Sequence, residues 1–438
     1  MDKAKKIELY FDDGFLTSEF LFFGLKLRKK VKPGRTRFYI NGLKLISCKN
    51  NYTTKDLIPY GYDFIFAHYA TDIECYVDNT KKQKKEMLLV CTDSIGDYLL
   101  WRNFIDDIRN SDKYAQFSIS MIACETYRHF LEYLDADKLH KVFYVPGRFE
   151  NLSTRKLIDI RRRLKDEGLK DYYDTIVFCS VNAARDDKFK AEQLITGNVV
   201  SRFSILHNHS LFKRNPLDLL KFTYVYRNYE DTFLHDFSKA KNFFSAFLGK
   251  ESSIEYPRIE LKTTEKNEHS GKYVVINPCG YDEYRCWNRV NWAELITWLH
   301  AQGLEVFLVC LEKERRFCEV IQTLCDGKAK IAAGLAVPDL LTLMSKAQLY
   351  IGADSGIFHA AAALDMKCMA LSSGSSYFRF MNYPKERKNV RVLFPEGVEK
   401  WIQKHRENDA EPDLKNFSIN SIRMEEVQAA CRDLLAVE

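Results

Sequence analysis

The chain has 438 residues, 46% of them hydrophobic, and a formal net charge of +6, which fits a globular protein of two or three domains. No stretch offers the roughly 18 uncharged apolar residues of a membrane-spanning helix, and the charged N-terminus lacks the apolar core of a secretory signal, so we expect a cytoplasmic protein. Twelve cysteines without a C-x-x-C pair argue against structural zinc and against a disulfide framework.

Residues 1–85 alternate short apolar runs with turns and predict a small β-rich module. Within it, residues 26–37 carry seven lysines and arginines and no acid. This stretch predicts a solvated hairpin around Pro33-Gly34, and an anionic membrane surface or a phosphorylated acceptor remains the other reading. Lysines in 81–85 predict a linker. The expected strands are 7–11, 20–27, 37–45 and 62–69.

From residue 87 onward, buried-strand runs alternate with helical periodicity, which predicts a parallel sheet with helices on both faces. Residues 207–270 are less regular, with one helix over 233–248 that ends at Gly249. The polar segment 262–271 predicts an interdomain linker. The expected strands are 87–92, 117–122, 140–145, 175–180 and 202–206, and the expected helices are 98–109, 125–134, 155–165 and 188–195.

A second alternation of strands and helices starts at residue 273. Two such α/β halves would enclose a cleft, and in open parallel sheets ligands bind at the carboxyl ends of the strands. The expected strands are 273–277, 305–310, 348–351, 367–371 and 390–393, and the expected helices are 292–301, 313–324, 338–346, 357–364 and 424–435.

The most informative stretch is 349–364, where an apolar strand is followed by Asp354, Ser355 and Gly356 and by an alanine-rich helix with His359 in its first turn. This geometry binds phosphate, because the first helical N–H groups have no partner within the helix and the helix dipole adds positive charge. Gly356 would let a ligand approach the backbone, and Ser355 adds a hydroxyl donor. An N-capped helix with a buried core histidine is the competing interpretation.

A similar strand, turn and helix occurs at 88–101, where Asp97 follows Gly96 in the first helical turn. A helix N-terminus stabilises the charged form of a carboxylate. Asp97 would therefore be ionised at neutral pH and would suit a general base at the edge of the cleft. The alternative is an aspartate that only caps its helix.

The second half opens with a strand end, a turn that contains Gly280, and then Arg285 beside Trp287. Arg285 could contact phosphate oxygens through two N–H groups, or it could be a surface arginine beside a packed tryptophan. The chain contains no G-x-G-x-x-G, Walker lysine loop, H-E-x-x-H or G-x-S-x-G motif.

Taken in order, three segments resemble glycosyltransferase family 9, the ADP-heptose:lipopolysaccharide heptosyltransferases. Residues 94–97 match the family's S-x-G-D element, 285–287 with 292–295 match Lys-x-Trp…W-A-E-L, and 354–362 match D-[ST]-G-x-x-H-x-A-A. The resemblance covers about 87–436 and implies a GT-B fold, an α/β architecture of two facing Rossmann-like domains with parallel sheets.

The resemblance, with the β-rich module added, implies three domains. Residues 1–85 would be an accessory module, 86–262 the acceptor domain and 272–438 the nucleotide-sugar donor domain, whose last helix is a candidate to pack back on the acceptor domain. Arg285 stands where the family usually has a lysine, and residues 364–367 replace its Leu-Gly-x-Pro turn.

The resemblance also implies roles for single residues. Asp97 stands where the family has its proposed catalytic base, in an N-terminal loop with Ser94 and Gly96. Glu312 and Glu314 are loosely aligned candidates for contact with the nucleotide ribose. The residues that fall where the family holds the donor diphosphate are Arg285, Asp354, Ser355, Gly356 and His359.

From the resemblance we expect an inverting, metal-independent glycosyltransferase that transfers heptose from ADP-heptose to lipopolysaccharide core or a related surface glycan. It would need no cofactor beyond the nucleotide sugar. Its partners would be the nucleotide sugar and a glycolipid or glycan acceptor, with peripheral contact at the cytoplasmic face of the bacterial inner membrane left open, and no nucleic acid. The alternatives are a GT-B enzyme for another nucleotide sugar, a sugar-nucleotide epimerase, or a non-catalytic glycan-binding or assembly protein.

Overall fold

The computed structural model describes the chain in segments, and it divides the chain into two units, 1–89 with 152–227 and 90–151 with 228–438. For the segments before residue 49 and for 202–206 and 224–227 it describes the backbone alone. The expected strand 62–69, the expected helix 188–195 and most of both expected linkers lie outside the described residues. The described segments are 8–12, 15–22, 25–32, 35–40, 43–48, 85–147, 154–170, 173–179, 202–206, 224–227, 234–262, 272–280, 285–406 and 417–437.

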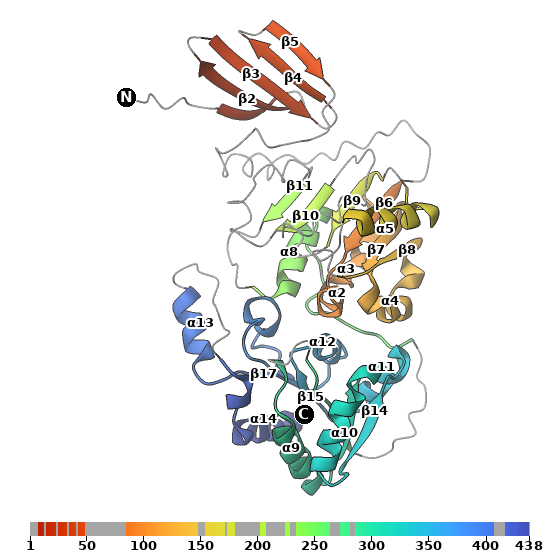
Figure 1. Ribbon diagram of the computed structural model, residues 1–438, viewed down its shortest axis with the longest axis vertical. Coiled ribbons are helices and arrows are strands. Elements are labelled where there is room, and N and C mark those ends of the chain that lie inside the picture. The colour runs from red at the N-terminus through yellow and green to blue at the C-terminus, as the bar shows by residue number, and fades with distance from the viewer. Residues whose placement is uncertain are drawn as a thin grey trace. The chain divides into compact units, whose positions relative to one another are not determined.

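The first described sheet is antiparallel, with strand order β1-β2-β3-β4-β5, as expected of a β-rich module (Figure 1). Lys32 lies opposite Arg35 in the pairing of β3 with β4, which confirms the hairpin around Pro33-Gly34. The single strand expected over 20–27 is divided between β2 and β3. The strands are β1 (Glu8–Asp12), β2 (Phe15–Phe22), β3 (Leu25–Lys32), β4 (Arg35–Ile40) and β5 (Leu43–Cys48).

The second sheet has the order β11-β10-β9-β6-β7-β8. The chain therefore builds outward from β6 in one direction and then returns to build in the other, as in doubly wound folds. Its strands are β6 (Glu86–Cys91), β7 (Ser118–Cys124), β8 (Lys141–Val145), β9 (Thr175–Phe178), β10 (Arg202–Leu206) and β11 (Tyr224–Arg227). The helices of this part are α2 (Ile95–Trp101), α3 (Phe104–Arg109), α4 (Arg128–Leu134), α5 (Thr154–Asp166) and α8 (Asp236–Leu248).

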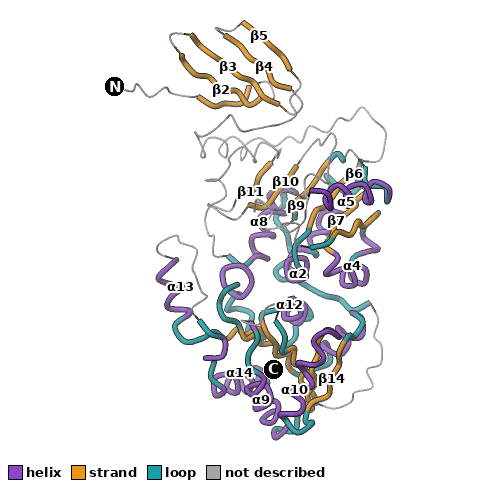
Figure 2. The backbone as a smooth tube through the Cα atoms, viewed as in Figure 1, coloured by secondary structure: helices purple, strands orange, loops and turns teal. Residues whose placement is uncertain are grey.

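The third sheet has the order β14-β13-β12-β15-β16-β17, and each neighbouring pair of strands is parallel. Figure 2 shows its strands among helices of the same unit. Its strands are β12 (Tyr273–Asn277), β13 (Glu305–Cys310), β14 (Ala329–Ala333), β15 (Leu349–Ala353), β16 (Cys368–Leu371) and β17 (Val390–Leu393). The helices are α9 (Arg289–Ala301), α10 (Arg315–Leu324), α11 (Val337–Ser345), α12 (Gly356–Ala363), α13 (Val398–Arg406) and α14 (Met424–Ala436).

These two parallel sheets with their helices confirm the α/β fold class. The helix expected to run without a break over 98–109 is instead two helices, α2 and α3, separated at Arg102 and Asn103. Both side chains at the break bind the backbone of Arg258. Among the described strands and α-helices, β11, β14 and α13 were not expected from the sequence.

The central strands of the third sheet, β12, β15 and β16, are buried along their whole length, as expected of a parallel sheet that helices cover on both faces. Trp287 and Trp292 are fully buried and pack edge to face, with ring centroids 5.2 Å apart. Cys91, Cys179 and Cys310 are buried free cysteines and form part of the core. Among the described residues, no helix combines the length and hydropathy that crossing a bilayer requires.

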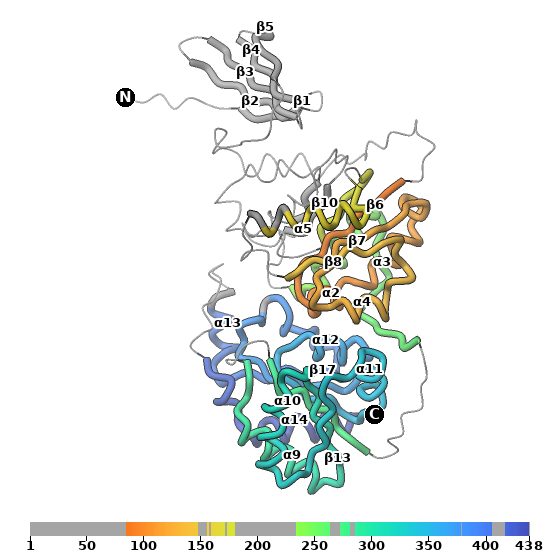
Figure 3. The backbone as a smooth tube through the Cα atoms, turned by 45° about the vertical axis from the view of Figure 1, so that its right-hand side comes forward, coloured from red at the N-terminus to blue at the C-terminus, as the bar shows by residue number. Residues whose placement is uncertain are grey.

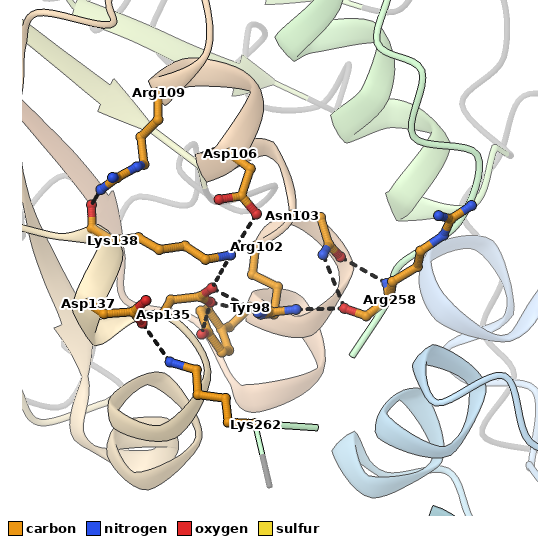
Figure 4. A network of polar contacts seen from close by, with 10 residues as sticks. All are labelled: Tyr98, Arg102, Asn103, Asp106, Arg109, Asp135, Asp137, Lys138, Arg258 and Lys262. Carbon is orange, nitrogen blue, oxygen red and sulfur yellow. Dashed lines mark hydrogen bonds and ion pairs between the residues drawn. The ribbon is translucent and has the colours of Figure 1, made fainter. Parts of the chain in front are cut away.

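The connector 251–262, between α8 and the third sheet, is tied to its neighbours through backbone groups (Figure 4). Arg258 N–H donates to Asn103 Oδ1 at 2.9 Å, and the Arg258 carbonyl accepts from Arg102 Nη1 at 2.6 Å. Ile259 N–H donates to the Ala363 carbonyl at the end of α12, at 2.8 Å. The connector is therefore hydrogen-bonded both to the α2–α3 break and to α12.

Candidate functional site

The strand order of the third sheet reverses at β12 and β15, the topological switch point where open α/β sheets bind ligands. Asn277 ends β12, and its side-chain amide donates to the Val309 carbonyl at 2.9 Å. The Ser355 hydroxyl, which follows β15, donates to Asn277 Oδ1 at 3.2 Å. Asn277 thus fixes Ser355 at the start of α12.

Asp354 and Arg285, which the sequence assigned to one diphosphate site, lie together at this edge. Arg285 Nη1 lies 3.7 Å from Asp354 Oδ1. The Asp354 side chain is buried and accepts a hydrogen bond from the Ser372 hydroxyl at 3.2 Å. Burial raises the pKa of Asp354, while Arg285 and the neighbouring serine hydroxyls oppose that rise. Arg285 thus brings a positive charge to the switch point.

The two strand-turn-helix motifs meet at their glycines, because α2 and α12 pack closely at their first turns (Figure 3). A Cβ on Gly356 would lie 2.1 Å from Ile95 Cγ2, and a Cβ on Gly96 would lie 2.9 Å from His359 Cδ2. The close approach that Gly356 permits is therefore to Ile95, a protein neighbour that the sequence did not indicate. Gly96 and Gly356 together bring the Asp97 turn against the start of α12.

The Asp97 carboxylate makes two contacts. Oδ2 accepts a hydrogen bond from the Ser94 backbone N–H at 3.2 Å, so Asp97 does cap the N-terminus of α2. Oδ1 accepts from Arg379 Nη2 at 2.7 Å. Burial raises the pKa of Asp97. Arg379 opposes this rise, and the negative charge of Asp236 adds to it. The base role of Asp97 stays a prediction.

Arg379 is a site residue that the sequence did not reveal. It lies on a π-helical turn, η7 (Tyr377–Met381), which follows the carboxyl end of β16. Such turns occur often at functional sites. Its Nε donates to Asp236 Oδ2 at 3.1 Å, so the guanidinium joins two carboxylates. No spacing rule links residues 97 and 379. The one sequence signal for Arg379 is that it is a basic residue that follows an apolar strand.

His359 is buried in the first turn of α12, and its Nδ1 lies 2.7 Å from the Tyr383 hydroxyl. Burial lowers the pKa of His359 to about 3, so the imidazole is neutral at neutral pH. A buried histidine that is hydrogen-bonded to a neighbouring side chain is what the alternative interpretation, a core histidine in an N-capped helix, predicts. A neutral ring brings no charge to a diphosphate, so any donor contact of His359 stays a prediction.

Glu312 and Glu314 lie in a short 3-10 helix, η6 (Glu312–Glu314), after β13. Glu312 is exposed and pairs with Arg315 Nε at 2.6 Å. Glu314 accepts the Leu311 backbone N–H at 3.0 Å. Their proposed contact with a ribose stays a prediction. Within the described segments, no group of three or more histidine, cysteine or acidic side chains is arranged to hold a metal ion.

Two doubly wound parallel sheets, with a helix N-terminus and an arginine at one switch point, define a GT-B type of α/β protein. Residues 220–408 match the family model described as glycosyltransferase family 9 (heptosyltransferase). The resemblance that the three motifs predicted is thereby confirmed. The matched range contains Arg285 and the 354–362 motif, while Asp97 lies outside it.

A curated relative, lipopolysaccharide heptosyltransferase 3 of Escherichia coli, is 31% identical over 138 residues, 30% of this chain and 41% of the relative. The chain thus spans less than half of that protein's length. Two solved structures share the fold at 15% identity over 80% of this chain. They are the family 9 glycosyl transferase of Veillonella parvula (TM-score 0.57, 97% of that chain) and E. coli heptosyltransferase WaaC with ADP-2-deoxy-2-fluoro heptose (TM-score 0.56, 99% of that chain).

Proposed function

We propose that the chain is an inverting glycosyltransferase that transfers heptose from ADP-heptose to lipopolysaccharide core or a related surface-glycan acceptor. The family description and the name of the curated relative support heptose transfer. The single observation that carries the proposal is the packing of the Asp97 turn against the first turn of α12 through Gly96 and Gly356. This packing puts a candidate base and a candidate phosphate site in one cluster.

In this proposal the donor diphosphate lies at the carboxyl edge of the third sheet. The first N–H groups of α12 and the Arg285 guanidinium would stabilise the charge that develops on the leaving ADP. The Ser355 hydroxyl, held by Asn277, lies at the same helix start. The proposal assigns the leaving-group charge to these groups, with no resident metal ion or cofactor.

Asp97 would take the proton of the acceptor hydroxyl while that oxygen attacks the anomeric carbon. Each Asp97 oxygen already accepts one hydrogen bond, and a carboxylate oxygen has a second lone pair for a proton. A carboxyl whose pKa is raised by burial is a stronger base than an ordinary aspartate, which favours general-base catalysis near neutral pH.

The acceptor would be a glycolipid or glycan, and the reaction would take place in the cytoplasm, with peripheral contact at the inner face of the bacterial inner membrane. A cytoplasmic nucleotide-sugar donor is what supports this location. The basic stretch in β3 and β4, whose sequence reads L-K-L-R-K-K-V-K and R-T-R-F-Y-I, supports an anionic acceptor surface.

The test is a ligand screen followed by a transfer assay. Thermal shifts with ADP, UDP and GDP and their sugars should favour ADP and ADP-heptose, because a ligand at 100 times its Kd stabilises the fold by about 2.7 kcal/mol. ADP release should then require both ADP-heptose and heptose-deficient lipopolysaccharide. A preference for UDP compounds would instead indicate another nucleotide-sugar enzyme.

A further inference from the structure

We propose that Arg379 and Asp236 form a positioning pair, in which Arg379 keeps the Asp97 carboxylate ionised and oriented for proton transfer and Asp236 holds Arg379 in place. This inference rests on the proposed function and adds two residues to it. Neither residue belongs to the three sequence motifs, and the two come from different elements, η7 and α8. What points to the role is that Arg379 contacts both Asp97 and Asp236.

The geometry is that of one guanidinium shared by two carboxylates. Arg379 donates from Nη2 to Asp97 Oδ1 at 2.7 Å and from Nε to Asp236 Oδ2 at 3.1 Å. Two different nitrogens of the planar group are used, so two hydrogen bonds fix its orientation. The Arg379 guanidinium also stacks on the ring of Phe380, 4.3 Å from the centroid. Asp97 thus receives its hydrogen bond from a group that is itself held.

Because the cluster is buried, these contacts affect whether the Asp97 carboxylate stays ionised. The Asp97 and Asp236 side chains are 9% and 2% exposed, and Arg379 is 29% exposed. A buried carboxylate without a cation takes up a proton instead of staying charged. Lys239, also buried, lies 3.2 Å from Asp236 Oδ1. Two carboxylates and two cations therefore balance within the cluster, and Arg379 is the cation that touches Asp97.

Three titratable groups packed near Asp97 keep one charge state in the working pH range. From α8, burial lowers the pKa of His235 to about 3, and from α12 the pKa of His359 is also about 3, so both rings are neutral. At the end of β7, burial raises the pKa of the Cys124 thiol, which keeps it protonated. Among the described residues, the charged members of the same cluster are Arg379, Asp236 and Lys239. A pH change of the reaction in this range would thus report on Asp97.

The pair also has a part in the proton-transfer step. The acceptor O–H bond breaks, its oxygen forms the new bond to the anomeric carbon, and the bond to the diphosphate breaks with its electron pair on the leaving ADP. The proton moves to Asp97, whose attraction for Arg379 is then lost. Asp236 retains Arg379 through the 3.1 Å contact. Arg379 is thus in place when Asp97 releases the proton to water.

The experiment compares Arg379→Ala, Arg379→Lys and Asp236→Asn by the pH profile of kcat/KM and by ADP affinity. In Arg379→Ala the acidic limb should move up by about 1 to 3 pH units, the range over which a nearby cation lowers an aspartate pKa. ADP affinity should stay within about twofold of wild type, because the role is exerted through Asp97 and not on the donor. Arg379→Lys keeps the positive charge, so its acidic limb should lie close to that of the wild type.

Asp236→Asn should move the limb the opposite way, to lower pH, because it removes a negative neighbour of Asp97 and leaves Arg379 to Asp97 alone. Arg387→Ala is the matched control. Arg387 is a buried arginine in the following loop, and its Nη2 donates to the Ala362 carbonyl at 2.9 Å. Its loss should lower stability without moving the limb.

A limb that stays in place in Arg379→Ala, or that moves together with a loss of ADP affinity, would overturn the proposal. Aspartate carboxyl carbon NMR, assigned with Asp97→Asn, reads the Asp97 titration without any transfer. If the wild-type chain transfers no heptose, the proposed function fails, while this titration still tests the pair. An Asp97 signal that titrates identically in wild type and in Arg379→Lys and Arg379→Ala would refute the pair directly.

Discussion

Gly356 lies directly against Ile95, so that a methyl group on Gly356 would come within 2.1 Å of Ile95 Cγ2. We expect Gly356→Ala to destabilise the fold by about 1 to 3 kcal/mol, the usual cost of inserting a methyl group into a packed contact. Urea denaturation measures this cost. In the double variant with Ile95→Ala, part of it should return, because the two changes share one contact. Additive effects of the two changes would contradict the close packing.

The Asp97→Asn variant tests the base. The amide keeps the shape of the carboxylate but cannot take a proton from the acceptor, so we expect heptose transfer to fall by about 10² to 10⁴-fold. ADP affinity, measured by calorimetry, should be unchanged because Asp97 is not assigned a donor contact. Asp112→Asn, an exposed aspartate beyond α3, should behave as wild type. Full activity in Asp97→Asn would remove this residue from the base role.

Arg285→Ala tests the phosphate contact. A hydrogen bond to a charged group contributes about 1.5 to 3 kcal/mol, so we expect ADP to bind at least roughly tenfold more weakly. Arg285→Lys should retain much of the affinity, since lysine is the residue that the family resemblance places there. Arg423→Ala, which removes an exposed arginine paired with Glu426, is the control. Unchanged ADP binding in Arg285→Ala would contradict the assignment.

His359 should make stability depend on pH. Its pKa in the fold is about 3, below the ordinary value of 6.5, so the unfolded chain binds the proton first as pH falls. The free energy of unfolding is then fully present above about pH 6.5 and declines toward pH 3, by about 1.4 kcal/mol per pH unit for one histidine. Denaturation of His359→Asn between about pH 4.5 and 7 should show a slope smaller by about this amount.

Two features make the His359 comparison specific. Buried Asp97 and Asp354 have raised pKa values and give the opposite slope, but they are present in both proteins and cancel in the difference. His129→Asn, at a side chain that is 82% exposed, should leave the slope unchanged. Equal slopes for wild type and His359→Asn would show that the ring is not buried neutral.

The ion pair in Figure 4 between Arg102 and Asp135 should carry stability. Arg102 Nε lies 2.7 Å from Asp135 Oδ2, with side chains 4% and 0% exposed. Asp135→Asn would leave a buried guanidinium without its counter-ion, at a cost of about 3 to 5 kcal/mol in denaturation. Asp137→Asn removes a partner of Lys262 that is 65% exposed and should cost less than about 1 kcal/mol. Similar losses of unfolding free energy in Asp135→Asn and Asp137→Asn would contradict the prediction that the buried ion pair contributes more than the exposed one.

The parallel strands were the part of the fold that the sequence predicted well. A buried strand covered on both faces reads as a nearly unbroken apolar run, and β12 and β13 begin and end at the predicted residues. β14 reads A-K-I-A-A, whose alanines give no strand signal, and it was missed. Gly249 was predicted as the end of a helix, and it adopts the left-handed conformation after α8.

The site was predictable where its residues share a local motif and unpredictable where they meet across the chain. Asp97 and Ser355 could be found because each stands at the start of a helix after an apolar strand. The Asp97–Arg379 contact joins residues 282 positions apart, and a π-helical turn has no sequence period that would direct attention to it. The sequence likewise could not show whether the space beside Gly356 would be filled by a ligand or by Ile95.

The contact between Gly96 and Gly356 has a consequence for synthesis on the ribosome. The two glycines are separated by 356 − 96, or 260, residues. At a translation rate of about 5 to 20 residues per second, the first turn of α2 emerges roughly 13 to 50 seconds before its partner exists. During that interval the nascent chain presents Ile95 without the helix that covers it, so this packing can form only after the α12 turn has been synthesised.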